Sequence, residues 1–415
     1  MFSRLSVLDD ISVRYSSVRI ASGWKLIGVQ HLMSPCGAML ESIHALGLRR
    51  EHMYVCGKAY STHPPTLLEL QQLGYAVANA AGELELGSYG SHLLSQVEQM
   101  WTRFRAALEP GDKIIILDDG GYVLKSCPQD ILEEHAVFGI EQTSSGIWEQ
   151  PAMGRMPVIN VAASAAKRFI EPRIVAESVK LRIGKLIADL EPQVIGVLGY
   201  GNVGKAIYEH MRARYDTIVY DHTPTIEERT ELQGNAVDSS EHLYERSDVI
   251  LSSTGRDVSR KEWLFNSTGD KTLVSLSSGD VEFNWLIRSC APYLEEPLTD
   301  PLQTLRIRTP NGHLLRVLRG GMVANFTGES ESGPGELIQM TRGLLLAAVI
   351  QIARDHDKLQ GKVGSIMLDP NMQKEVMDLW LADQPAQRDN YSPRILEGFG
   401  DVEWINGNSE GTLMV

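Results

Sequence analysis

A glycine-rich turn between two apolar runs constrains the fold of this chain more than any other feature. The apolar run that starts at Val194 leads directly into Gly199, Gly201 and Gly204, which are spaced as Gly-x-Gly-x-x-Gly. A second apolar run follows and ends on Asp221. A strand, a glycine turn, a helix and a second strand ending on an acid form the dinucleotide-binding unit of parallel α/β sheets.

Each position in this turn has its own expected task. Gly199 permits the tight turn, Gly201 lets the backbone approach a pyrophosphate, and Gly204 lets the helix pack closely on the strand. The pyrophosphate would rest on the helix N-terminus. Asp221 would accept hydrogen bonds from the adenosine ribose and repel a 2′-phosphate, which favours NAD. The alternative is a glycine-rich turn that binds no ligand.

Composition and charge exclude several classes of protein. The 415 residues allow two or three domains, and 43% hydrophobic with 22% charged residues are ordinary for a soluble globular protein. The formal net charge of −14 argues against a nucleic-acid partner, because phosphates attract a basic surface. The longest apolar stretch, residues 343–350, is far shorter than the ~20 residues that span a bilayer. We therefore expect neither nucleic acid nor membrane as a partner.

The cysteines and the N-terminus indicate the compartment. Four cysteines lie scattered, with no Cys-x-x-Cys and no histidine spacing suited to a metal, which is typical of free thiols in a reducing environment. The first ten residues contain acids where a signal peptide would need an apolar core. We expect a cytoplasmic protein without a metal site.

Alternation of strand-like and helix-like segments predicts the architecture. Strands are expected at 24–30, 53–56, 113–117, 249–252 and 272–276, and helices at 37–48, 66–73, 91–108 and 172–190. We predict an α/β fold with two doubly wound parallel-sheet domains and a C-terminal segment that returns to the first domain. The expected ranges are 1–172 for a substrate domain, 173–335 for a Rossmann NAD-binding domain, and 336–415 for a helical segment packed on the first domain or on a neighbouring subunit.

Further motifs occur in the order seen in one enzyme family. They are His31 with Glu41, Ser61-Thr62, the Leu-Asp-Asp-Gly-Gly run 117–121, the hydroxyl run 143–145 before Gly146, residues 159–167, and residues 311–325. Over roughly residues 24–355 the chain resembles the S-adenosylhomocysteine hydrolase family. The resemblance implies a bound NAD⁺ that oxidises a nucleoside 3′-hydroxyl, so that the ketone acidifies C4′–H and the 5′ substituent leaves or water adds. It also implies a small nucleoside-like substrate and a homodimer or homotetramer.

The resemblance assigns four catalytic candidates. Lys167 and Glu171 would transfer a proton at the 3′-hydroxyl; the family carries Asp at the position of Glu171. Asp119 and His31 would serve the chemistry at C4′ and C5′. Each has a structural alternative. Lys167 could be a solvated lysine at a helix start, and Glu171 could form an ordinary surface i,i+4 ion pair with it. Asp119 could cap the glycine turn that follows it, and His31 could be a structural histidine.

The remaining candidate residues are assigned to cofactor and substrate. The expected cofactor residues are Gly199, Gly201, Asn202, Val203, Gly204 and Asp221 in the turn, Thr143, Ser144, Ser145 and Asn325 on the nicotinamide side, and Thr254. The expected substrate residues are Ser61, Thr62 and Gln142. The alternative for the Ser/Thr residues is that they belong to ordinary loops, in which such runs are common.

Several family residues are replaced in this chain. Gln142 stands in place of a glutamate, Pro172 in place of an asparagine, and the segments around Asp280 and at 329–334 each lack a family histidine. Residues 409–415 do not match the family's lysine- and tyrosine-containing tail. These replacements argue against adenosylhomocysteine itself as the substrate.

Three functions remain open from the sequence. The first is an NAD-dependent relative of adenosylhomocysteine hydrolase that acts on a nucleoside or related sugar. The second is a non-catalytic regulator that binds NAD or a nucleoside, and the third is a dehydrogenase with exchangeable NAD. Lys167 and Asp119 favour the first, because a pure binding module has no use for a base beside the nicotinamide.

Overall fold

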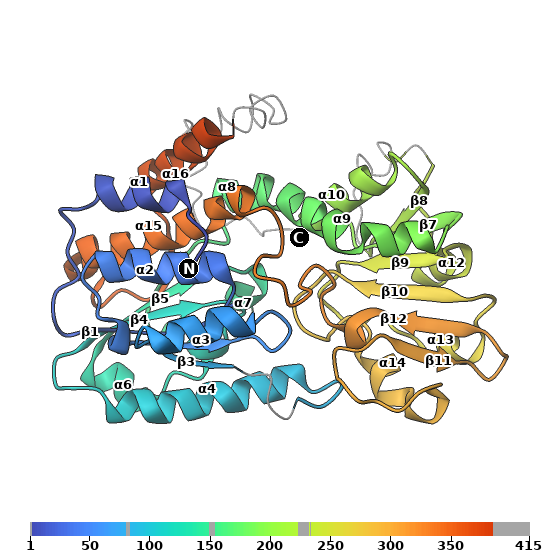
Figure 1. Cartoon of the computed structure of the whole chain (residues 1–415), viewed down its shortest axis with the longest axis horizontal. Coiled ribbons are helices and arrows are strands. Elements are labelled where there is room, and N and C mark those ends of the chain that lie inside the picture. The colour runs from blue at the N-terminus through green and yellow to red at the C-terminus, as the bar shows by residue number, and fades with distance from the viewer. Residues whose placement is uncertain (1, 80–83, 149–153, 223–231, 233, 385–415) are drawn as a thin grey trace. The chain divides into compact units, whose positions relative to one another are not determined.

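Two structural units make up the chain in the computed structural model, which describes residues 2–79, 84–148, 154–222, 232 and 234–384. Unit 1 comprises Met1–Gly82, Leu93–Glu171 and Gly328–Val415, and unit 2 comprises Glu83–His92 and Pro172–Thr327. The chain therefore passes between the units four times: after Gly82, within helix α4, at the start of helix α9 and after Thr327 (Figure 1).

Unit 1 contains a parallel seven-stranded sheet in the order β13-β6-β5-β4-β1-β2-β3. Its central strands are apolar because helices cover both faces, and every residue of β1 is buried. The strands are β1 (Trp24–Gln30), β2 (Met53–Gly57), β3 (Ala76–Asn79), β4 (Lys113–Asp118), β5 (Ala136–Glu141), β6 (Pro157–Asn160) and β13 (Gly364–Met367).

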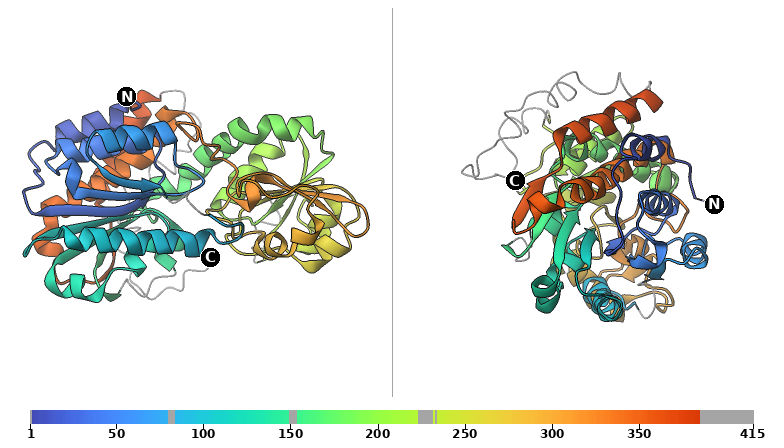
Figure 2. Two further views of the ribbon diagram at one scale, coloured as in Figure 1. Left: turned by 60° about the horizontal axis from the view of Figure 1, so that its bottom comes forward. Right: turned by 90° about the vertical axis from the view of Figure 1, so that its left-hand side faces the viewer.

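The helices of unit 1 lie on both faces of this sheet, with α4 on one face and α2 and α15 on the other (Figure 2). The helices are α1 (Ser6–Arg14), α2 (Ser34–Ala45), α3 (Pro64–Gln72), α4 (Tyr89–Ala106), α5 (Tyr122–Lys125), α6 (Gln129–Glu134), α7 (Ser144–Trp148), α8 (Ala165–Phe169), α15 (Gly335–Leu359) and α16 (Pro370–Asp383), with a 3₁₀ turn at Arg50–His52.

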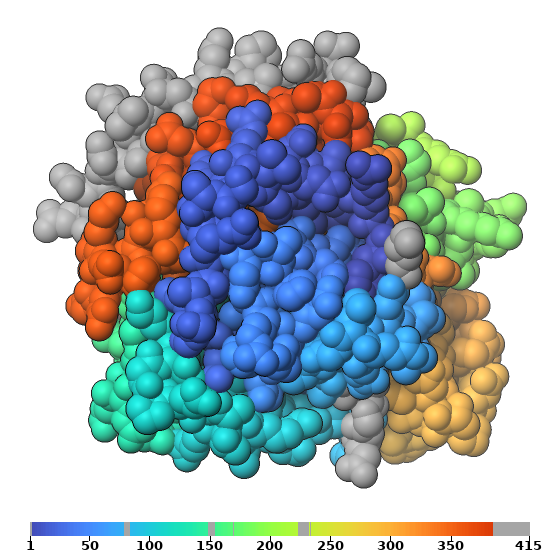
Figure 3. Space-filling view, turned by 60° about the vertical axis from the view of Figure 1, so that its left-hand side comes forward, coloured from blue at the N-terminus to red at the C-terminus, as the bar shows by residue number. Residues whose placement is uncertain are grey.

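Helix α15 forms the core on its side of unit 1. By length and composition it is the one described helix that could cross a membrane, yet 83% of its most apolar window is buried inside the protein. A Cβ on Gly343 would come within 2.9 Å of Val7 and 3.0 Å of Val376, so this glycine lets α1, α15 and α16 pack together. The N-terminal residues and the C-terminal helices accordingly lie side by side on one face of unit 1 (Figure 3).

Unit 2 contains a six-stranded sheet in the order β11-β12-β10-β9-β7-β8, parallel except for the β11–β12 pair. Its strands are β7 (Val194–Leu198), β8 (Asp216–Tyr220), β9 (Val249–Ser252), β10 (Lys271–Ser275), β11 (Leu305–Arg308) and β12 (Leu314–Val317). Its helices are α9 (Glu171–Asp189), α10 (Asn202–Met211), α12 (Ser240–Arg246), α13 (Lys261–Phe265) and α14 (Asn284–Ser289), with 3₁₀ turns at Ala291–Tyr293 and Leu318–Gly321.

Each sheet reverses its strand order once, and the reversal marks where ligands bind in such folds. In unit 1, β1 pairs with β2 on one side and β4 on the other. In unit 2, β7 pairs with β8 on one side and β9 on the other. The α/β fold with two doubly wound, mainly parallel sheets and a C-terminal segment returning to the first sheet is as the sequence predicts.

The division of the chain differs from the expected ranges at Pro172, which belongs to unit 2, and in two longer segments. Residues 83–92 belong to unit 2, because the Tyr89 N–H donates to Asp280 Oδ2 (3.1 Å) and Arg288 Nη2 donates to the Gly87 carbonyl (2.8 Å). Residues 328–335 belong to unit 1, where the Ser34 N–H donates to the Ser330 carbonyl (2.9 Å). The expected mismatch at residues 409–415 lies outside the described residues.

Candidate functional site

The glycine turn of unit 2 has the geometry that the sequence predicts. Gly199 has a φ of +95°, and a Cβ there would lie 3.1 Å from atoms of Ser253 and Thr254. A Cβ on Gly204 would lie 1.9 Å from the Gly199 carbonyl oxygen, so only glycine lets α10 approach the turn. A Cβ on Gly201 would meet no protein atom within 4 Å. The turn is closed where helix and strand meet and open where a ligand would approach.

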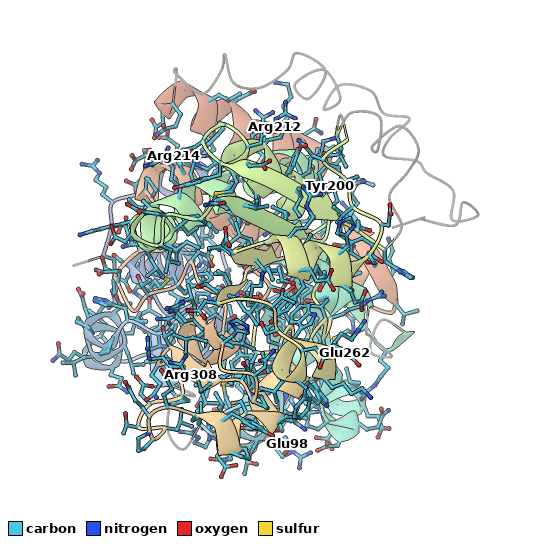
Figure 4. The ribbon with its side chains drawn as sticks, turned by 90° about the vertical axis from the view of Figure 1, so that its right-hand side faces the viewer. Glu98, Tyr200, Arg212, Arg214, Glu262 and Arg308 are labelled. Carbon is cyan, nitrogen blue, oxygen red and sulfur yellow. The ribbon has the colours of Figure 1, made fainter. Side chains whose placement is uncertain are left out.

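The open side of the turn is the start of a helix. Gly201 is the N-cap of α10 and no side chain caps it, so the first-turn N–H groups around Asn202 and Val203 face a region suited to an anion. Tyr200 lies in this turn, and Arg212 and Arg214 follow the far end of α10 (Figure 4). The residues present fit the pyrophosphate of a dinucleotide.

Asp221 lies directly after β8 and is held beside the turn. Its Oδ2 accepts a hydrogen bond from the Tyr200 N–H (2.5 Å). The Gly199 N–H donates to the Tyr220 carbonyl (2.8 Å), which joins the turn to the same strand end. The acid is therefore held beside the glycine turn by the backbone of that turn.

Asn325 offers an unused acceptor at another strand end. The Ala324 N–H donates to the Ser275 carbonyl at the end of β10 (2.9 Å), and this places Asn325 at the same edge of the sheet. Asn325 is only 6% exposed, and its Oδ1 has no hydrogen-bond partner among the described residues. A buried acceptor without a donor fits a ligand amide such as the nicotinamide carboxamide.

Glu282 organises the third strand end, and sequence reasoning gave it no role. It is fully buried, and its Oε1 accepts from Ser252 Oγ (2.9 Å) and from the N–H (2.6 Å) and Oγ1 (3.1 Å) of Thr254. Its Oε2 accepts from Ser275 Oγ (2.9 Å) and the Leu276 N–H (3.2 Å). The Thr254 hydroxyl is thus used within the protein, and Glu282 holds the segment against which Gly199 packs.

We expect Glu282→Gln to weaken NAD binding about tenfold, because an amide turns one of these acceptor positions into a donor that faces other donors. Titration of NAD⁺ against the intrinsic fluorescence of the protein measures the change. Glu262→Gln is the matched control, since Glu262 lies exposed on α13 of the same unit (Figure 4). Equal affinities for both variants would contradict this role of Glu282.

The carboxyl edge of the unit 1 sheet carries a buried polar cluster, which we call the Asp119 cluster. It consists of His31, Lys58, Asp119 and Gln142, which follow β1, β2, β4 and β5. Lys58 Nζ lies 2.6 Å from Asp119 Oδ1, His31 Nε2 lies 3.1 Å from Asp119 Oδ2, and Gln142 Nε2 donates to Oδ2. The four residues come from the strands around the reversal point between β1 and β4.

The cluster fixes the protonation of its members. Burial, and secondarily Lys58, lowers the pKa of His31 to about 4 although Asp119 opposes this change, so the imidazole is neutral at physiological pH. Burial opposes ionisation of Asp119, but Lys58 and His31 outweigh it and hold the pKa of Asp119 below its usual range. Asp119 also outweighs burial in raising the pKa of Lys58.

The hydrogen-bond partners then define the histidine tautomer. An ionised Asp119 only accepts, so His31 carries its proton on Nε2 and leaves Nδ1 as the acceptor for Ser61 Oγ (2.6 Å). Thr62 Oγ1 donates to the Lys58 carbonyl (2.8 Å). Ser61 and Thr62, expected to bind substrate, therefore act here as supports of the cluster.

Two further buried carboxyl groups lie at this edge, and sequence reasoning missed Glu141. Asp118 accepts from the N–H groups of Asp119, Val123 and Leu124, and burial raises its pKa to about 6. Burial, with Asp118 and Asp119 adding to it, raises the pKa of Glu141 to about 8. Each is the last residue of a buried strand, and this position after an apolar run is the sequence feature that could have identified them.

The hydroxyl residues 143–145, expected near the nicotinamide, differ in their contacts. Thr143 donates its N–H (2.7 Å) and its Oγ1 (2.8 Å) to Glu141 Oε1, while Ser144 and Ser145 are exposed. A Cβ on Gly146 would lie 2.2 Å from Glu141 Oε2, so this glycine makes room for the carboxyl group. Thr143 therefore supports Glu141, and the two serines remain available to a ligand.

Glu141 makes the stability of the protein depend on pH. Since its folded pKa is raised to about 8, its contribution to stability is complete at low pH and is lost as the pH rises through that value. We expect the free energy of unfolding to fall by a few kcal/mol as the pH rises from about 4.5 to about 8, and Glu141→Gln to flatten this fall. Urea denaturation at several pH values tests it, with exposed Glu134→Gln as the control; an unchanged slope in Glu141→Gln would contradict it.

Lys167 and Glu171 form a close pair in unit 1. Lys167 Nζ lies 2.5 Å from Glu171, and Thr341 Oγ1 donates to Glu171 Oε1 (2.8 Å). The two residues belong to successive helices, α8 and α9, which meet at Ile170. Their side chains are 9% and 20% exposed, so the pair is more protected than an ordinary surface ion pair.

The expected residues fall into two groups by unit. Unit 1 contains His31, Ser61, Thr62, Asp119, Gln142, Thr143, Ser144, Ser145, Lys167 and Glu171, whereas unit 2 contains Gly199, Gly201, Asn202, Val203, Gly204, Asp221, Thr254 and Asn325. Among the described residues no cluster of histidine, cysteine, aspartate or glutamate is arranged to hold a metal ion.

Comparison with known families identifies the nature of the second unit. Residues 162–265 match the model of the NAD-binding domain of D-isomer specific 2-hydroxyacid dehydrogenases. This range contains the glycine turn, Asp221 and Thr254. The protein therefore carries a Rossmann-type NAD-binding domain, and NAD is its cofactor.

Comparison with curated proteins finds relatives over most of the chain. The chain is 30% identical over 347 residues to an uncharacterized protein of Mycobacterium tuberculosis, found in strains CDC 1551 and H37Rv; the match covers 80% of this chain. The chain spans 64% of the length of that relative. It is 22% identical over 379 residues to the adenosylhomocysteinase of Sulfolobus acidocaldarius, covering 88% of this chain and 86% of that protein.

Solved structures of two dehydrogenases match at low similarity. A D-lactate dehydrogenase from Sporolactobacillus sp. matches with a TM-score of 0.35 and 13% identity, over 82% of this chain and 100% of that chain. The NAD⁺-bound 3-phosphoglycerate dehydrogenase of Entamoeba histolytica matches with a TM-score of 0.39 and 11% identity, over 82% and 99%.

Proposed function

We propose that this protein is an NAD-dependent enzyme of the adenosylhomocysteinase type that acts on a nucleoside or a related sugar. Its reaction is transient oxidation of the 3′-hydroxyl followed by elimination or addition at C4′ and C5′. The distant similarity to an adenosylhomocysteinase supports this reaction class. The observation that carries the proposal is the Asp119 cluster, in which a buried carboxylate and a neutral imidazole lie 3.1 Å apart.

The NAD-binding turn, Asp221 and Asn325 would hold the cofactor in unit 2. When bound, NAD⁺ accepts a hydride from a carbinol carbon and can return it, which makes the oxidation transient. The Asp221 carboxylate beside the turn would repel a 2′-phosphate. These residues would bind and orient the cofactor, whereas residues of unit 1 would transfer the protons.

Lys167 and Glu171 would move the proton of the 3′-hydroxyl. Lys167 Nζ accepts that proton once it has passed its own to Glu171, whose Oε1 lies 2.5 Å away. Thr341 holds the Glu171 carboxylate in place through its hydroxyl. A lysine with a fixed carboxylate partner can both take and return the proton, as the reversal of the oxidation requires.

His31 would move the proton at C4′ and at the 5′ leaving group. The lowered pKa of Asp119 makes that carboxylate a weak base, so its task is to fix the imidazole and balance its charge. Nδ1 of the neutral His31 is the basic nitrogen, and it exchanges its Ser61 contact for the substrate proton. The substrate is not expected to be adenosylhomocysteine, because two histidines of that family are replaced.

The test is to mix the purified protein with NAD⁺ and a panel of nucleosides and to follow the NADH absorbance band. A bound NADH signal that does not exceed one equivalent, and that Lys167→Ala removes, supports transient oxidation. NADH that accumulates with turnover indicates net dehydrogenation instead. NAD⁺ binding without any NADH signal indicates a regulatory protein, which would overturn the proposal.

A further inference from the structure

Arg342 is a buried cation that no carboxylate of the described residues neutralises. It lies in α15 and is 5% exposed. Its Nη1 donates to Gln30 Oε1 (2.8 Å), which is its one hydrogen bond among the described residues, and its Nε is buried without a partner. Since a guanidinium has five N–H donors, most of its hydrogen-bonding capacity is unused.

Another arginine of the same helix shows how a structural arginine is satisfied. Arg354 donates to Asp355 through Nε (2.8 Å) and to Asp369 through Nη2 (2.8 Å), although it is more exposed than Arg342. Burying a charge without a partner is much less favourable than pairing it near the surface. The isolation of Arg342 therefore indicates a missing anion.

Lys58 is a second buried cation with unused donors. It is 1% exposed, and its ammonium makes one hydrogen bond among the described residues, to Asp119. An ammonium has three N–H donors, so two remain. Lys58 belongs to the Asp119 cluster through its contact with Asp119, and Arg342 lies beside the cluster because its partner Gln30 is the last residue of β1 and directly precedes His31. Both cations also lower the pKa of the His31 imidazole.

The cations and carboxylates at this edge of the sheet are not paired one to one. Asp119 neutralises one of the two cations, and Asp118 uses its oxygens on backbone N–H groups. With its pKa raised to about 8, Glu141 is mainly neutral at physiological pH. Among the residues described, Arg342 is therefore the cation that no carboxylate contacts, and its unused donors are left for a ligand.

We propose that the Asp119 cluster binds an anionic group of the substrate, a carboxylate or a phosphate, between Lys58 and Arg342. This inference rests on the proposed function and names the substrate class within it: a sugar acid or sugar phosphate, with or without a base, rather than a neutral nucleoside. Arg342 is the specificity-determining residue, because its planar fork matches the two oxygens of either anion.

Calorimetric binding of three matched probes to the full chain, in the presence of NAD⁺, tests this inference. The probes are adenosine, adenosine 5′-carboxylate and adenosine 5′-monophosphate, which differ in the group at C5′. We expect at least one anionic probe to bind about tenfold or more tightly than adenosine, and the tighter one identifies the anion. Arg342→Gln should remove this preference, so that the three probes bind with similar affinity. Arg342→Lys should restore part of it, and the control Arg354→Gln should keep all of it.

Equal affinity of the wild-type chain for all three probes, or an undiminished preference in Arg342→Gln, would overturn the anion site. The NADH band recorded in the same samples separates this result from the proposed function. An anion preference that depends on Arg342 without NADH from any probe supports the site and contradicts the oxidation. NADH from adenosine without an anion preference contradicts the site and supports the oxidation.

Discussion

Replacing Lys167 by arginine should lower the rate of NADH formation about 1000-fold and leave NAD binding intact. Arginine can keep the ion pair with Glu171 that now spans 2.5 Å, but it does not release its proton at accessible pH. A purely structural pair would survive this change, whereas a proton-transfer pair would not. Stopped-flow absorbance with the best substrate of the nucleoside panel measures the rate.

Two controls make the Lys167 result specific. Lys185→Arg introduces the same change at an exposed position of α9 and should leave the rate unchanged. Titration of NAD⁺ should give the same affinity for Lys167→Arg as for the unaltered chain. A Lys167→Arg variant with near-normal rate would show that the pair is structural and would remove Lys167 from the proposed mechanism.

Replacing Gly201 by valine should weaken NAD binding at least about 100-fold without unfolding the protein. The backbone of Gly201 has an ordinary φ of −69°, and a Cβ there meets no protein atom within 4 Å. The valine side chain would therefore occupy only the space through which the pyrophosphate approaches the helix. Calorimetric titration of NAD⁺ measures the loss, and thermal unfolding checks that the fold is kept.

Two other glycines provide the comparison for Gly201. Gly269 also has open space around its Cβ position but lies away from the turn, so Gly269→Val should bind NAD normally. Gly204→Val should fail differently, by unfolding or loosening unit 2, because its Cβ would collide with the Gly199 carbonyl. Normal NAD affinity in Gly201→Val would show that the cofactor does not cross the turn there.

The sequence predicted the geometry of the glycine turn well because its determinants are local. Three glycines at fixed spacing, an apolar run on each side and one acid define a unit of consecutive residues, and the structure shows each in its expected place. Lys167 and Glu171 were likewise linked by their spacing of four. The structure changes only the detail, since the pair joins two helices that meet at Ile170.

The Asp119 cluster could be predicted only in part because it depends on the order of strands in space. His31 and Asp119 were each found at the end of a strand, but their contact follows from the pairing of β1 with β4. Lys58 was missed, since nothing local marks a lysine as buried. Its signal was its place directly after β2, which puts it at the same edge of the sheet.

Two other buried charged residues, Arg342 and Glu282, were also missed from the sequence. Arg342 directly precedes the longest apolar stretch of the chain, and Glu282 lies in a motif noted only for a replaced histidine. Both side chains are buried by residues that are distant in the sequence, so their burial could not be predicted from their neighbours. The short strand β13 was missed for a different reason: it is an edge strand of four residues whose exposure alternates, so no apolar run marks it.

The central claim is that unit 1 performs proton chemistry on a sugar that bound NAD⁺ oxidises transiently, and solvent exchange tests it most directly. The protein is incubated with NAD⁺ and adenosine, adenosine 5′-carboxylate or adenosine 5′-monophosphate in D₂O, and each recovered probe is examined by NMR at C4′. A ketone at C3′ makes the C4′ hydrogen exchangeable, so at least one probe should gain deuterium at C4′ only when NAD⁺ is present, and His31→Gln should prevent the exchange. Tight NAD⁺ binding with no deuterium at C4′ in any of the three probes would contradict the account.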